Sequence, residues 1–131
     1  RVRHHQVIAE QLGQELEVSQ ETYLDMATAI SASGPAYVFL FMEALVDAAV
    51  HQGLPRPVAE TLVRQTMSGA VALAGNSEKN LAELRHSVTS PGGTTAAALL
   101  VLEDGALRAL LTKAAVAAHQ RAQALGSSTS K

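Results

Sequence analysis

Hydrophobic residues recur along most of the chain at intervals of three and four, the spacing that places them on one face of a helix. Polar and apolar residues nowhere alternate convincingly with the period of two that indicates a strand. The pattern therefore predicts an all-α fold, a bundle of helices around a shared core. A short helix is expected over about 2–16, and longer ones over about 20–30, 36–50, 57–74 and 106–125, with shorter ones near 81–85 and 95–104.

Capping residues and helix breakers mark the expected helix ends. The residues that mark helix starts are Ser19, Pro35, Pro57, Asn80 and Thr94 or Thr95. Glu21 lies in the first turn after Ser19, and Asn80 forms a capping box with Glu83. The residues that mark helix ends are Gly53, Gly75 and Gly105. Gly69 lies inside a helical pattern, where glycine is unfavourable, and this predicts a close helix contact at that position.

The segment Val38–Val50 is apolar on nearly every side. A helix of this kind must be buried all round, at the centre of a helical domain or at a subunit interface. Because other helices of so short a chain can hardly enclose it, we expect oligomerisation. Glu43 and Asp47 lie four residues apart on one face, and we interpret them as the polar edge of the helix rather than as a general acid–base pair.

Composition narrows the function. With 131 residues, of which 47% are hydrophobic, the chain is the size of one domain. A net charge of −2 and an aromatic content of 3% disfavour nucleic-acid binding, and no basic amphipathic face points to a membrane surface. There is no cysteine, which excludes disulfides and thiolate chemistry. The polar start of the chain indicates no signal peptide, so a cytoplasmic location is the default expectation, and 127–131 are expected to form a disordered tail.

The segment Val88–Thr95 carries the strongest local signal for binding. Two glycines after a proline allow a sharp turn, and two threonines follow where a helix N-cap is wanted. The first N–H groups of a helix lack intrahelical partners, so a carboxylate or phosphate can bind there without a lysine or arginine. An isolated Gly-Gly-Thr is also compatible with an ordinary capped turn.

Several catalytic and cofactor motifs are absent from the sequence. It contains no G-x-G-x-x-G, no G-K-[ST] after the paired glycines, no H-E-x-x-H and no G-x-S-x-G. The histidines are scattered or, at His4 and His5, adjacent, so that they do not form a pair of metal ligands on one helix face. No metal site is therefore predicted.

Four segments in this order closely resemble the C-terminal domain of pyrroline-5-carboxylate reductase. They are Ala32-Ser33-Gly34-Pro35-Ala36-Tyr37, Gly53-Leu54-Pro55, the stretch from Leu84-Arg85 to Thr95 with its Ser-Pro-Gly-Gly-Thr-Thr, and Leu102-Glu103 with Leu107-Arg108. The resemblance runs from about Val18 to about Gly126. Ala32 departs from it, because a glycine is usual there, and residues 1–16 match poorly.

The resemblance implies an oxidoreductase of proline biosynthesis that reduces 1-pyrroline-5-carboxylate to L-proline with NADPH or NADH. It implies a helical domain over 18–126, similar to the C-terminal domain of 6-phosphogluconate dehydrogenase, that forms an interlocked homodimer or a larger homo-oligomer. Residues 1–17 would be a linker or short helix after a Rossmann domain that this sequence lacks. That missing domain would bind most of the cofactor, so we expect no catalysis from this chain alone.

The resemblance also assigns the site. Ser90 and the backbone N–H groups near Gly93 and Thr94 would hold the substrate carboxylate, in the turn that Gly92 helps to form. The hydroxyl of Thr95 would face the ring nitrogen as the catalytic group, orienting the substrate with or without a water. Val88 would pack against the ring, and Glu78 would reach the site from a neighbouring subunit.

Two other functions compete with the reductase half. The chain could be a stand-alone helical interaction domain that retains the packing of the family without its chemistry. A phosphate-binding regulatory module is less favoured, because no lysine or arginine flanks Gly92 and Gly93.

Overall fold

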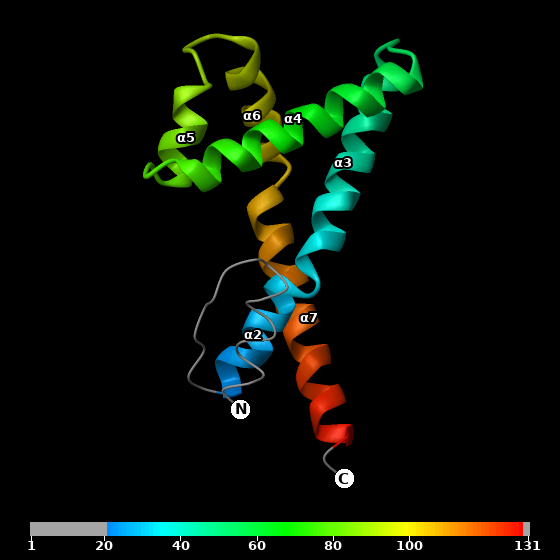
Figure 1. Ribbon diagram of the computed structural model, residues 1–131, viewed down its shortest axis with the longest axis vertical. Coiled ribbons are helices and arrows are strands. Elements are labelled where there is room, and N and C mark those ends of the chain that lie inside the picture. Colours follow the sequence, from blue (N-terminus) through cyan, green and yellow to red (C-terminus); the bar gives the residue numbers. More distant parts are fainter. Residues whose placement is uncertain (1–20, 130–131) are drawn as a thin grey trace. The chain divides into compact units, whose positions relative to one another are not determined.

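The computed structural model describes residues 21–129, and the described residues contain helices and no strand. The helices, shown in Figure 1, are α2 (Glu21–Ser31), α3 (Gly34–His51), α4 (Arg56–Asn76), α5 (Leu81–Ser87), α6 (Thr94–Asp104) and α7 (Leu107–Thr129). The predicted all-α fold is confirmed for this part of the chain. The expected helix over 2–16 and the cap at Ser19 lie outside the described residues.

Most of the predicted helix ends are confirmed, because each depends on local chemistry. α3 begins at Gly34, just before Pro35, and ends ahead of Gly53, whose φ of 114° is a conformation that favours glycine. Pro57 lies in the first turn of α4. Asn80 caps α5 by accepting from the Glu83 N–H at 2.9 Å, and the Glu83 carboxylate accepts from the Asn80 N–H at 3.2 Å.

Two compact units make up the chain. One contains the described residues up to Val38 and from Leu107 onward, and in it α2 and α7 lie side by side (Figure 1). Ala29 is buried in this unit, and its carbonyl accepts a hydrogen bond from the Tyr37 hydroxyl at 3.0 Å, which ties the start of α3 to α2.

The second unit spans Phe39–Ala106 and contains most of α3 together with α4, α5 and α6. Its core is small and lies between α3 and α4. Val46, Ala59 and Val63 are buried there, and the partly buried Met42, Ala49, Val50 and Met67 pack against them.

The described residues do not enclose the apolar helix α3. Val46 is its only residue that is buried, while the side chains of Phe39 and Leu40 are 66% and 65% exposed. Of the two expected environments, the described residues do not provide the centre of a domain, and the subunit interface stays a prediction. By length and composition Tyr23–His51 would also suit a membrane crossing, but a turn at Ala32–Ser33 divides it into two helices.

Two local expectations are wrong, and a third, the close contact at Gly69, is not met within the described chain. Gly93, not a threonine, is the N-cap of α6, because the turn before it ends at Gly93. α7 continues to Thr129 and so includes part of the segment expected to be a disordered tail; adding residues to a long helix is far easier than nucleating one. Nothing in the described chain lies within 4 Å of the position of a Cβ at Gly69, since that face of α4 carries no neighbouring helix there.

We predict that Ala59→Leu destabilises the second unit. Ala59 is fully buried between α3 and α4, so that a larger side chain must displace Val46 or Val63, at a cost of about 1–3 kcal/mol. Urea unfolding at a fixed protein concentration measures the change, with Ala72→Leu on the exposed part of the same helix as the control. Equal stability of the two variants would contradict this location of the core.

Candidate functional site

The end of α5 is held by bonds from the residues that follow it. The N–H of its C-cap residue, Val88, donates to the carbonyls of Arg85 and His86. The N–H of Thr89 donates to the His86 carbonyl at 3.0 Å, and the Thr89 hydroxyl donates to the Arg85 carbonyl at 2.6 Å. The chain thus leaves α5 in a defined direction.

A tight turn over Ser90–Gly93 follows. The Gly93 N–H donates to the Ser90 carbonyl at 3.1 Å, Pro91 occupies the second position, and Gly92 has a φ of 70°. These are the features of a type II turn, in which the third residue needs a positive φ and glycine adopts it without steric cost. The expectation that Pro-Gly-Gly forms a sharp turn is confirmed.

Gly93 lies directly against Ser90. A Cβ at Gly93 would be 3.1 Å from the Ser90 Oγ and 3.2 Å from the Ser90 carbonyl oxygen, closer than ordinary contacts. The φ of −88° and ψ of −177° at Gly93 are open to any residue, so the requirement for glycine here is one of space. The missing side chain lets the Ser90 hydroxyl lie over the start of α6.

The first turn of α6 presents backbone donors. The Gly93 carbonyl accepts the first bond of the helix from Ala97 at 3.2 Å, and no side chain caps the helix. The N–H groups of Thr94, Thr95 and Ala96 therefore have no partner within the helix. Together with the positive end of the helix dipole, they favour an anionic group beside the Ser90 hydroxyl. Ser90 and Thr94 are exposed, whereas Thr95 is partly buried.

The structure brings most of the predicted site residues together on one short segment. Val88, Ser90, Gly92, Gly93, Thr94 and Thr95 all lie between the end of α5 and the first turn of α6. Glu78 does not join them in the same chain, because it precedes α5 and the turn follows it. Seven helical residues separate the two ends by about 10 Å. That Glu78 reaches the site from a neighbouring subunit stays a prediction.

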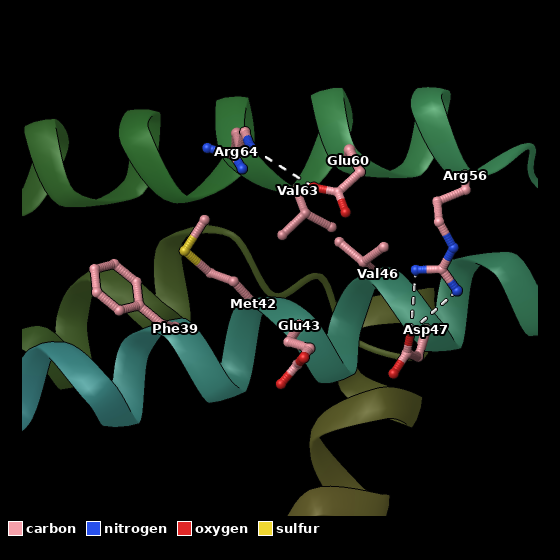
Figure 2. Close-up of a pocket in the computed structure, with 9 residues that line it drawn as sticks. All are labelled: Phe39, Met42, Glu43, Val46, Asp47, Arg56, Glu60, Val63 and Arg64. Atoms are coloured by element: carbon pink, nitrogen blue, oxygen red, sulfur yellow. Dashed lines mark hydrogen bonds and ion pairs between the residues drawn. The ribbon is translucent and has the colours of Figure 1, made fainter.

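A groove between α3 and α4, with a volume of about 420 Å³, is a feature that the sequence reasoning missed (Figure 2). Its floor is apolar, with Met42, Val46 and Val63, and charged side chains stand along it. Arg56 donates from both terminal nitrogens to the Asp47 Oδ1 at 3.2 Å. The only sequence signal was the position of Asp47 and Arg56 on either side of the Gly53–Pro55 connector.

The ion pair of Asp47 helps to decide the role of Glu43 and Asp47, the two carboxylates on one face of α3. Asp47 is engaged by Arg56, and Figure 2 shows Glu43 standing apart from that pair. On α4, Glu60 lies 3.6 Å from the Arg64 Nε. The arrangement is that of exposed ion pairs beside a helix contact, which agrees with the interpretation of Glu43 and Asp47 as a polar edge. Among the described residues, no group of His, Asp and Glu side chains is placed to hold a metal ion.

Comparisons with known proteins all point to one family. Residues 21–125 match the profile of the family described as pyrroline-5-carboxylate reductase dimerisation. The chain is 45% identical over 106 residues to the pyrroline-5-carboxylate reductase of Synechocystis, covering 81% of this chain and 40% of that protein. It is 46% identical over 110 residues to the reductase of Arabidopsis thaliana, with 84% and 40% covered.

Solved structures give the same result. The pyrroline-5-carboxylate reductase of Coxiella burnetii superimposes with a TM-score of 0.80 at 50% identity, covering 82% of this chain and 40% of that one. The pyrroline carboxylate reductase of Plasmodium falciparum, solved with NADP bound, has a TM-score of 0.79 at 41% identity and covers 82% and 41%. The chain thus spans about two fifths of the length of these proteins.

Proposed function

This chain belongs to the pyrroline-5-carboxylate reductase dimerisation family, and we propose that it is the substrate-binding and dimerising half of such a reductase. The reaction is the reduction of 1-pyrroline-5-carboxylate to L-proline, in proline biosynthesis. The observation that carries the proposal is the turn between α5 and α6, where the Ser90 hydroxyl and unpaired N–H groups converge without a competing side chain at Gly93.

The carboxylate of the substrate fits this arrangement. It would accept hydrogen bonds from the Ser90 hydroxyl and from backbone N–H groups at the start of α6, with the helix dipole supporting its charge. Val88, whose side chain is 62% exposed at the end of α5, would supply an apolar surface for the ring. Glu78 of a second copy would approach from outside the chain.

Thr95 is the proposed catalytic residue. Its hydroxyl would hydrogen-bond to the ring nitrogen and orient the C=N bond, while the proton that this nitrogen needs comes from solvent, directly or through the hydroxyl. A nicotinamide cofactor, NADPH or NADH, supplies the hydride that adds to the imine carbon, and an N-terminal domain would bind most of it. Because a threonine hydroxyl is weakly acidic, its main contribution is orientation.

The exposed apolar side chains of α3 support an assembly of at least two copies, which we propose to be an interlocked homodimer. The side chains of Phe39, Leu40 and Phe41 present apolar surface of the kind that subunit interfaces bury. We also propose a cytoplasmic location.

The test is the oxidation of NADPH and of NADH, with and without pyrroline-5-carboxylate, by the complete protein that contains this chain. We expect substrate-dependent oxidation of at least one cofactor, followed as a loss of nicotinamide absorbance. A folded oligomer without turnover would overturn the reductase proposal and favour the helical interaction domain. The exposed apolar side chains of α3 would then form its binding surface.

A further inference from the structure

Thr89 is attached to α5 by two hydrogen bonds, although it lies outside that helix. Its hydroxyl reaches the Arg85 carbonyl at 2.6 Å, and its backbone N–H reaches the His86 carbonyl at 3.0 Å. Both acceptors are among the last carbonyls of α5, which have no partner within the helix. Thr89 is partly buried, whereas Val88 and Ser90 on either side of it are exposed.

These two bonds fix both the backbone and the side chain of the residue that immediately precedes Ser90. The next constraint along the chain is the bond from the Gly93 N–H to the Ser90 carbonyl, which closes the turn. The position of the Ser90 hydroxyl over Gly93 therefore depends on the end of α5 through Thr89. α5 is in turn held at its start by the capping box of Asn80 and Glu83.

We infer that Thr89 is a positioning residue: its hydroxyl bond to the Arg85 carbonyl sets where the Ser90 hydroxyl and the first turn of α6 meet a carboxylate. This inference rests on the proposed function. Thr89 itself need not touch the substrate. A misplacement of Ser90 by a fraction of an ångström would weaken the hydrogen bonds to the carboxylate, whose strength falls steeply with poor geometry.

Thr89→Val tests this in the complete protein, because valine has nearly the shape of threonine and lacks the hydroxyl. We expect the KM for pyrroline-5-carboxylate to rise about tenfold, and the inhibition constant of the product proline to rise with it. The KM for the cofactor should stay within about twofold, since ground-state binding of the imine is what changes. Thr89→Ser restores the donor and should bring the KM for pyrroline-5-carboxylate back to within about twofold.

Two control variants separate positioning from a general loss of stability. Ser87→Ala removes a hydroxyl bond to the Leu84 carbonyl, of 2.7 Å, within the same helix but before the turn. Thr61→Val makes the same substitution at a threonine whose hydroxyl bonds to the Pro57 carbonyl in α4. Both should leave the KM for pyrroline-5-carboxylate unchanged. Thr89→Ala, which also lacks the hydroxyl, is measured in parallel. The result then does not depend on whether the valine side chain fits at this position.

The outcomes are distinct. If the unaltered protein reduces pyrroline-5-carboxylate, an unchanged KM for this substrate in both Thr89→Val and Thr89→Ala overturns the inference. The inference is also overturned if Ser87→Ala raises this KM as much as Thr89→Val does. A raised KM that Thr89→Ser does not restore also overturns it, because the hydroxyl would not be the cause. Absence of turnover in the unaltered protein instead overturns the proposed function.

Discussion

Gly93→Val is expected to lower kcat/KM for pyrroline-5-carboxylate by about 100-fold or more in the complete enzyme. A Cβ at this position already comes within 3.1 Å of the Ser90 Oγ and 3.2 Å of its carbonyl oxygen, and the valine methyl groups add further bulk. The Ser90 hydroxyl must then move from the start of α6, and in the proposed site the carboxylate would lose both a donor and its close approach to the backbone. Steady-state kinetics measure the change.

Valine is also a poor N-cap, so a second variant is needed to separate crowding from the loss of α6. Gly93→Ser provides a side chain that favours helix starts, yet places a Cβ in the same space. We expect its activity to fall as well, with unchanged circular dichroism. Gly75→Ala, at a glycine with nothing within 4 Å of its Cβ position, is the matched control and should keep full activity. Normal activity in both Gly93 variants would contradict the assignment of the site to this turn.

Thr95→Val should lower kcat by about 100-fold, with little change in the KM for the cofactor. Thr95 is partly buried in the first turn of α6. In the proposed site, the loss of its hydroxyl would leave the imine nitrogen without a hydrogen-bond partner and the C=N bond without a fixed orientation. The measurement is the rate of cofactor oxidation at saturating pyrroline-5-carboxylate.

Thr95→Ser retains the hydroxyl and should keep kcat within about tenfold of the unaltered enzyme. Binding of proline, followed by calorimetry, should survive in Thr95→Val, because the backbone donors proposed to hold the carboxylate would remain. If Thr95→Val instead lost proline binding and kept its kcat, the result would contradict this prediction. Thr95 would then act in carboxylate binding and not in catalysis.

Much of the helical framework could be predicted because its signals are local. The capping box of Asn80 and Glu83, the proline at the start of α3 and the positive φ at Gly53 each arise from residues a few positions apart. The turn before α6 was predictable for the same reason, since a proline followed by glycine specifies a type II turn almost by itself. The candidate site residues of that segment therefore lie together in the structure, and their roles stay predictions.

Features that depend on space were not predictable from the pattern. Gly93 caps α6 in place of a threonine because the closing bond of the turn falls on it, and its contact with the Ser90 hydroxyl is a matter of geometry. The bond from Thr89 to the Arg85 carbonyl carries no sequence signature of its own. Asp47 and Arg56 meet only because α3 and α4 pack against one another.

The sequence by itself determined that the chain is helical, where most of its helices begin and end, and that α3 needs apolar surroundings, because periodicity, caps and breakers act over a few residues. Only the tertiary structure showed how little of α3 the described residues cover: the core of the second unit holds Val46, Ala59 and Val63, and Phe39 and Leu40 are left exposed. Burial depends on which surfaces meet across the whole fold, and a linear pattern does not contain that information.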